Sequence, residues 1–245
     1  MTALVEGYTH FLAAMLLVVL PAIQVLGRQR ARAILRDLDA RTRPAFYRQQ
    51  SLVLVALAVM TLPPILFGLA RLSDYRLFSG APLPGAAGLA GVLAIWLLYR
   101  RIMADRRRCG SAQRRMRGYA SADVLAMTPG RRRELPLWDL MSVAAGIGEE
   151  LAYRGFLLWY LSALVSSGWA ILLTAAGFAA AHAYQGWRSV LIVFTLGLVF
   201  GGLTVLSGSL WPAILLHALV DMEAGRFYMR LKANMDTPVN IRPED

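Results

Sequence analysis

Six ionisable side chains interrupt otherwise apolar stretches in the second half of this 245-residue chain. They are Glu149, Glu150, Arg154, His182, His217 and Asp221. A charged side chain at the centre of a bilayer costs roughly 2.5–3.5 kcal/mol on insertion scales. Such groups are rare in spanning helices and usually mark a reaction site or an ion pathway, so all six are candidates for function.

Spacing places some of these side chains next to each other on helices. Glu150 and Arg154 are four residues apart, and so are His217 and Asp221, so each pair shares one helix face. An aromatic residue, Phe178, lies four residues before the other buried histidine. Considered alone, Glu150 and Arg154 are explained equally well by a structural ion pair and by a reactive site.

The chemistry that this set allows is hydrolysis. Glu149 in an apolar pocket could act as a general base on water, and His182 could share that water. His217 with a neighbouring polar group could stabilise the oxyanion of an attacked peptide carbonyl. The two histidines with Glu149 and Asp221 also form a possible zinc ligand set, so metal-activated water remains open.

The elements that must position these residues are membrane helices. The chain is 57% hydrophobic and 17% charged, whereas soluble domains average about 25% charged residues. Its net charge of +11 comes from arginines between apolar runs, which fits membrane orientation better than nucleic-acid binding. The single cysteine, Cys109, excludes a disulfide framework and a cysteine-rich metal site.

Seven apolar runs predict seven spanning helices. They lie near residues 8–26, 52–70, 84–99, 136–164, 169–184, 190–206 and 210–227. The arginine-rich segment 27–50 carries apolar residues at helical spacing and is predicted to lie on the membrane surface. Since the basic segments fall on one side, the positive-inside rule predicts an outer N-terminus and a cytoplasmic C-terminus.

The predicted fold is therefore an all-α polytopic bundle. Residues 1–135 form three spans with basic cytoplasmic loops, residues 136–230 form a four-helix core with all six ionisable groups, and residues 231–245 form a cytoplasmic tail. No basic residue precedes the first span, which is expected to be a retained helix. The preference for arginine over lysine indicates a prokaryotic, multi-pass protein of the cell membrane.

Three motifs in order along the last four predicted spans carry a family resemblance. They are Glu149-Glu150-x-x-x-Arg154, Phe178-x-x-x-His182 and His217-x-x-x-Asp221. This pattern resembles the CPBP family of CAAX proteases and bacteriocin-processing intramembrane proteases, also called the Abi family. The family includes the Rce1-type prenyl-protein endopeptidases.

The resemblance implies a role for each motif residue. Glu149 would activate the water with help from His182. His217 and the last motif residue would form the oxyanion site. Glu150 and Arg154 would support the site, with Phe178 beside it.

At the last motif position the family usually has asparagine, whereas this chain has Asp221. An ionised carboxylate would repel an oxyanion, so Asp221 must be protonated, orient His217 or bind a metal. The family has been described as metalloproteases on its motifs, and its Rce1-type mechanism as a metal-independent one based on glutamate. The resemblance therefore leaves a divalent metal such as zinc open.

The resulting prediction is an intramembrane endopeptidase that cleaves near the cytoplasmic side of the bilayer. Its substrate would be a peptide or protein, lipidated or membrane-bound, and no nucleic-acid partner is expected. The alternative is a membrane scaffold, a bacteriocin-immunity protein or a proton-coupled transporter that uses the same buried charges. The sequence contains neither a His-Glu-x-x-His zinc motif nor a Gly-x-Ser-x-Gly serine motif, which disfavours other intramembrane proteases.

Overall fold

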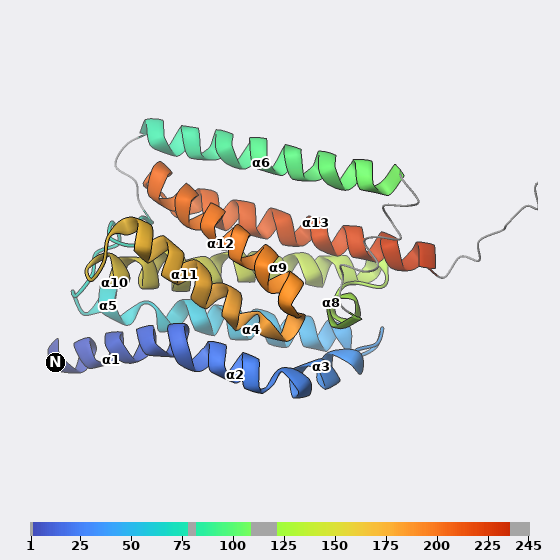
Figure 1. The fold of residues 1–245 in the computed structure, drawn as a ribbon, viewed down its shortest axis with the longest axis horizontal. Helices are drawn as coiled ribbons and strands as arrows, with labels where there is room; N and C mark the ends of the chain where they lie inside the picture. The colour runs from blue at the N-terminus through green and yellow to red at the C-terminus, as the bar shows by residue number, and fades with distance from the viewer. Residues whose placement is uncertain (1, 78–81, 109–121, 236–245) are drawn as a thin grey trace, which may run out of the picture.

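The computed structural model describes residues 2–77, 82–108 and 122–235, and all regular elements within these ranges are helical (Figure 1). The first half contains α1 (Thr2–Ala14), η1 (Met15–Val19), α2 (Leu20–Leu26), α3 (Arg28–Arg36), α4 (Arg43–Met60), α5 (Pro63–Leu66) and α6 (Pro82–Arg108). After it come α8 (Ala122–Met127), η2 (Arg132–Glu134), α9 (Leu135–Glu150), η3 (Leu151–Leu157) and α10 (Leu158–Ser162). The last elements are α11 (Ser167–Ala181), η4 (Ala183–Gln185), α12 (Trp187–Ser207) and α13 (Trp211–Met235).

Among the described residues, three helices are long and apolar enough to cross a membrane. They cover Ala3–Leu26, Arg43–Leu66 and Trp187–Ser207. The helix α11 is apolar but shorter. An all-helical membrane protein is thus confirmed, while the count of seven spans and the orientation of the two termini stay predictions.

The predicted surface helix over residues 27–50 is wrong in its extent. Only α3 forms a separate helix there, and from Arg43 onward the chain already belongs to α4. Between them the carboxylate of Asp39 accepts hydrogen bonds from the backbone N–H groups of Arg41 and Thr42, at 2.8 and 2.9 Å. These bonds lower the pKa of Asp39 and stabilise a turn instead of another helical turn.

Three further boundaries differ from the predicted apolar runs. The predicted apolar run 84–99 lies within a longer helix, α6, which continues through the basic residues that follow it up to Arg108. The candidate span Arg43–Leu66 is interrupted at Thr61 and Leu62, between α4 and the short helix α5, which begins at Pro63 and Pro64. Prolines are favoured in a first turn because their missing N–H has no partner there in any helix. The last helix, α13, continues to Met235 and so includes the start of the predicted tail.

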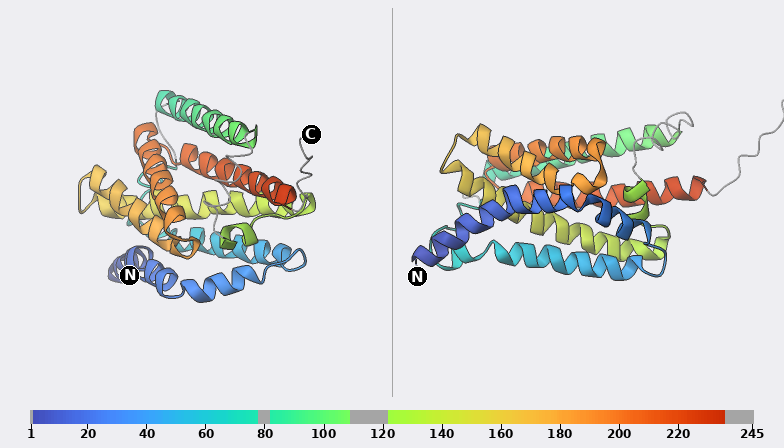
Figure 2. Two further views of the ribbon diagram at one scale, coloured as in Figure 1. Left: turned by 45° about the vertical axis from the view of Figure 1, so that its right-hand side comes forward. Right: turned by 60° about the horizontal axis from the view of Figure 1, so that its bottom comes forward.

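The helix α9 lies in the middle of the bundle, between α4 and α13 (Figures 1 and 2). Glycines allow these close approaches. A Cβ atom at Gly146 would lie 2.8 Å from the carbonyl oxygen of Ile214 on α13, and one at Gly148 would collide with the carbonyl of Leu54 on α4. The backbone of the predicted motif helix is therefore in direct contact with helices on both sides.

The helices α11 and α12 pack against each other and against η3, the segment that continues the central helix α9. Their connecting turn lies well short of the C-terminal end of α13 (Figure 1). Gly186 has a φ of +97° in that turn, a conformation that favours glycine. Because α11 ends early, its last residues are placed at the middle of the bundle, where the motif residues of α9 and α13 lie.

Candidate active site

Three helical regions bring the six ionisable side chains together. Glu149 and Glu150 end α9, and Arg154 lies in the π-helical segment η3 that continues it. His182 caps the C-terminal end of α11. The last two, His217 and Asp221, lie on α13, the helix that packs most extensively on α9 together with α4.

Glu149 stands between the two histidines. Its Oε1 is 4.0 Å from Nε2 of His182, and its Oε2 is 3.5 Å from Nε2 of His217. The side chains of Glu149 and His182 are both 17% exposed. These separations are longer than direct hydrogen bonds, and they leave a carboxylate and two ring nitrogens facing one partly accessible space.

The opposite nitrogen of each imidazole is anchored. Nδ1 of His182 lies 2.8 Å from the carbonyl oxygen of Phe178, which can only accept a hydrogen bond, so Nδ1 carries the proton. Nδ1 of His217 lies 2.8 Å from Oε1 of Glu150 and donates to it in the same way. Each Nε2 is therefore directed toward Glu149 by a hydrogen bond on the far side of its ring.

Glu150 and Arg154 form a buried ion pair, as their spacing predicted. Nη1 of Arg154 is 3.0 Å from Oε1 of Glu150, and both side chains are fully buried. Nη2 donates to the carbonyl of Gly197 on α12 at 3.2 Å, where a Cβ atom would lie only 3.1 Å from that nitrogen. The guanidinium also lies over the ring of Phe178, 4.4 Å from its centroid.

Asp221 lies at the accessible edge of the cluster. Its Oδ2 is 3.6 Å from Nε2 of His217, and its side chain is 39% exposed, compared with 7% for the histidine. Its backbone carbonyl accepts a hydrogen bond from the indole N–H of Trp138 at 2.9 Å, which ties α13 to α9 at this level. Exposure thus increases along α13 toward its arginine-containing C-terminal half.

Several residues that contact the site lie outside the three sequence motifs. The ring of Phe200 stacks on His217 with an interplanar angle of 15°, and Tyr184 stacks on His182. The π-helical geometry of η3 was also not predicted, although such segments are frequent at functional sites. Gly197 was detectable as a small residue on an apolar helix, but Phe200 is one of many apolar residues there and had no distinguishing feature.

A metal ion is not supported by this arrangement. Among the described residues, no group of three or more His, Cys, Asp or Glu side chains could hold one. The set considered from the sequence, Glu149, His182, His217 and Asp221, is brought together but does not form a ligand cage. No step of the mechanism below therefore passes through a metal.

Comparison with known protein families gives a match in the second half of the chain. Residues 131–222 match the family described as type II CAAX prenyl endopeptidase Rce1-like. The matched segment contains all six ionisable residues of the cluster. Comparisons with curated proteins and with solved structures gave no significant match.

Proposed function

We propose that this chain is an intramembrane endopeptidase in which Glu149 activates the attacking water, since residues 131–222 match the Rce1-like CAAX-protease family. The match to a protease family supports a peptidase in general. The observation that carries the specific role is the geometry of Glu149, whose two oxygens face two Nε2 atoms at 3.5 and 4.0 Å. A water between them would be oriented by three groups.

In the first step, Glu149 takes a proton from this water, and the resulting hydroxide oxygen attacks the carbonyl carbon of the scissile peptide. His182 accepts the second hydrogen of the water at Nε2, since its Nδ1 proton is bound to the Phe178 carbonyl. The lone pair of the water oxygen is thereby directed at the substrate. His182 acts here by orienting the nucleophile.

The attack places negative charge on the former carbonyl oxygen. His217 has a carboxylate beside each ring nitrogen, Glu150 at Nδ1 and Asp221 near Nε2, which allows both nitrogens to be protonated. In that state the Nε2–H donates to the oxyanion. Glu149 then gives its proton to the departing amide nitrogen, the C–N bond breaks, and a carboxylic acid and an amine are released.

Asp221 orients His217 in this proposal and does not itself bind the oxyanion, because an ionised carboxylate would repel it. Glu150 and Arg154 fix the position of the His217 ring through the buried hydrogen bond at Nδ1. Phe178 contributes to both sides: its carbonyl anchors His182 and its ring lies under Arg154.

We propose that the site opens toward the arginine-rich end of the bundle. Glu149, His182 and Asp221 are its exposed members, and the nearest part of α13 beyond them carries Arg226 and Arg230. By the positive-inside rule this end is cytoplasmic, so cleavage would occur near the cytoplasmic face of a prokaryotic cell membrane. A membrane-bound, lipidated peptide fits both this position and the prenyl substrates in the family description.

Cleavage of a peptide panel by the purified full chain tests this proposal. The panel contains prenylated and unprenylated peptides of the same sequence, each assayed with and without a chelator. Wild type is expected to cleave at least one peptide, and Glu149→Ala and His182→Ala are expected to lose this activity. Glu6→Gln removes an exposed carboxylate far along the chain in α1 and serves as a control that should remain active.

Equal cleavage by wild type, Glu149→Ala and His182→Ala would contradict the protease proposal. The buried charges would then be better explained by a scaffold, an immunity protein or a proton-coupled transporter. Loss of wild-type activity with the chelator, restored by added zinc, would contradict the metal-free part of the mechanism.

A further inference from the structure

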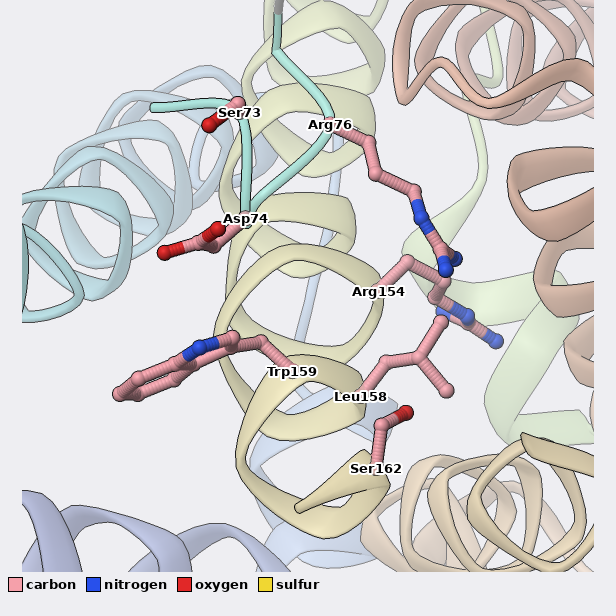
Figure 3. Close-up of a pocket in the computed structure, with 7 residues that line it drawn as sticks. All are labelled: Ser73, Asp74, Arg76, Arg154, Leu158, Trp159 and Ser162. Carbon is pink, nitrogen blue, oxygen red and sulfur yellow. The ribbon is translucent and has the colours of Figure 1, made fainter. Parts of the chain in front are cut away.

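A polar pocket lies beside Arg154, and Glu149 is not among the residues that line it. It has a volume of about 300 Å³ and is formed by the loop after α5 together with η3 and α10 (Figure 3). The loop contributes Ser73, Asp74 and Arg76, and the helix contributes Arg154, Leu158, Trp159 and Ser162. None of the lining residues except Arg154 takes part in the mechanism proposed above.

The loop is built to hold the Arg76 side chain in this pocket. Tyr75 is fully buried, and its hydroxyl donates to the carbonyl of Thr61 at 2.9 Å. Arg76 has a φ of +55°, a left-handed conformation that residues with a Cβ atom rarely adopt. Its carbonyl accepts a hydrogen bond from Leu210 N at 2.9 Å, just before α13. Backbone strain of this kind persists where the surroundings enforce it and often accompanies a binding function.

Both guanidinium groups of the pocket have buried N–H groups that lack a hydrogen-bond acceptor. These are Nη1 of Arg76 and Nε of Arg154. In the close-up both groups extend to the same side of the pocket, whereas the carboxylate of Asp74 points the opposite way (Figure 3). Asp74 instead accepts the backbone N–H of Arg71 at 2.7 Å.

The charges around the pocket are unbalanced. Glu150 compensates Arg154 through Nη1, but among the described residues no ion pair involves Arg76. Burial lowers the pKa of the Arg76 guanidinium, which reflects the loss of water around its charge. An anion in the pocket would supply the missing acceptor atoms and the missing negative charge together. It would bind Nε of Arg154 and leave the bond from Nη1 to Glu150 intact.

We propose that this pocket binds a phosphate group, held between Arg76 and Arg154. Guanidinium groups match phosphate oxygens in geometry and charge, and donors that approach from both the loop and the helix suit a tetrahedral anion better than a planar one. Ser162 also lines the pocket, and its hydroxyl lies on the same side as the two guanidinium groups (Figure 3). The volume exceeds that of free phosphate, and Leu158 and Trp159 form an apolar wall, so a phospholipid headgroup also fits.

Thermal unfolding of the full chain in detergent tests the binding. Sodium phosphate is titrated at constant ionic strength against sodium chloride, and the unfolding midpoint of wild type is expected to rise saturably, because a ligand that binds only the folded state stabilises it. Arg76→Ala should lose the saturable rise. Arg71→Ala removes an exposed arginine of the same loop, and it should keep the rise at the wild-type concentration of half-saturation.

A second variant covers the possibility that Arg76→Ala does not fold. Ser162 is exposed at the end of α10, so Ser162→Asp places a carboxylate at the pocket without removing an arginine. It is expected to raise the midpoint in chloride and to abolish the phosphate dependence. A wild type without a saturable phosphate effect, or an effect that is equal in Arg76→Ala and wild type, would overturn the proposal.

The source of the phosphate is decided by a third measurement. Short-chain phosphatidic acid and inorganic phosphate are compared as stabilisers of the delipidated protein. If the lipid saturates at a concentration at least tenfold lower, and only with Arg76 present, the site binds a headgroup; equal concentrations identify a site for free phosphate. Since these readouts do not involve peptide cleavage, they stand or fail independently of the protease proposal.

Discussion

Two neighbouring glutamates occupy opposite environments in this bundle. Glu150 is fully buried and bonded to Arg154 and His217, whereas Glu149 is 17% exposed and has only longer contacts, of 3.5 and 4.0 Å. The end of α9 thus provides one carboxylate for the reaction and one for holding the His217 ring in place. A carboxylate that performs chemistry needs access to water, and a carboxylate that supports a ring needs complete burial and short bonds.

The same comparison separates the rest of the cluster into two layers. The accessible layer contains Glu149, His182 and Asp221, and the buried layer contains Glu150 and Arg154. His217 connects them, because its Nδ1 is bonded in the buried layer and its Nε2 faces the accessible one. Substitutions in the two layers should therefore differ in kind, with loss of activity in one and loss of stability in the other.

The largest effect is expected for Glu149→Gln. This change removes the base but keeps the shape, so the second-order rate constant for peptide cleavage should fall about 10²–10⁴-fold. The unfolding midpoint should stay near that of wild type, because Glu149 makes no short bond that the amide would break. Cleavage kinetics and thermal unfolding on the same preparation check both statements. Retention of more than a tenth of the activity would contradict the role of Glu149.

Glu150→Gln should show the reverse order of effects. The substitution leaves the Arg154 guanidinium buried without a counter-charge, and breaking such a pair typically costs about 3–5 kcal/mol. The free energy of unfolding, measured in detergent with denaturant, should fall by that amount. The double variant Glu150→Gln with Arg154→Met removes the buried charge and should recover part of the loss. A single variant as stable as wild type would show that the buried layer is not a structural support.

A smaller effect is expected for Asp221→Asn. The carboxylate of Asp221 is partly exposed and lies 3.6 Å from Nε2 of His217. The CPBP family, which this chain resembles, usually has asparagine at this position. Activity should stay within roughly tenfold of wild type, since an amide can still orient the ring and no longer repels an oxyanion. Asp221→Ala should be less active than Asp221→Asn. If asparagine abolishes cleavage, the charge at this position has a direct role in the reaction.

The smallest effect concerns Lys232, a half-buried cation that, unlike Arg154, has no carboxylate bonded to it in the described structure. Nζ of Lys232 donates to the carbonyl of Thr128 at 2.6 Å. The pKa of Lys232 is lowered from 10.5 to about 8, mainly by burial and to a smaller extent by the positive charge of Arg43. Between these values the folded state binds fewer protons than the unfolded state, so stability should rise with pH from about 8 to 10.5.

Lys232→Met provides the matched measurement for this last prediction. The variant should lack the rise in unfolding midpoint over that pH window, and below pH 8 it should be at least as stable as wild type. A rise of the same size in both proteins would assign the pH dependence to other groups. The comparison with Glu150→Gln then shows how much a bonded carboxylate contributes to tolerating a buried cation.

Much of the cluster was predictable because helical spacing is a local property. The pairs Glu150 with Arg154 and His217 with Asp221 lie within one helix, and their contacts follow from separations of four residues. The bond from His217 to Glu150 joins two helices, and no spacing determines which of two adjacent glutamates faces the partner. The catalytic roles themselves stay predictions until the variants are assayed.

The parts of the fold that were mispredicted depend on tertiary or side-chain detail. The turn at Asp39 depends on a single carboxylate, which accepts backbone N–H groups that a helix would otherwise use. The surrounding arginine-rich sequence is compatible with a helix and gives no sign of this turn. Phe200 was missed because, within an apolar helix, the face toward a site and the face toward lipid have the same composition.

The π-helical segment Leu151–Leu157 has a consequence for how this chain can vary in length. A π-turn accommodates an additional residue over a stretch that a regular helix would cover with one residue fewer. Deletion of one residue between Glu150 and Arg154 could therefore be absorbed by a return to α-helical geometry, with both ends of the long helix kept in place. The arginine, which lies in the middle of this segment, would then be three residues after the glutamate instead of four. Among homologous sequences, a one-residue gap at this point should accompany loss or relocation of the arginine.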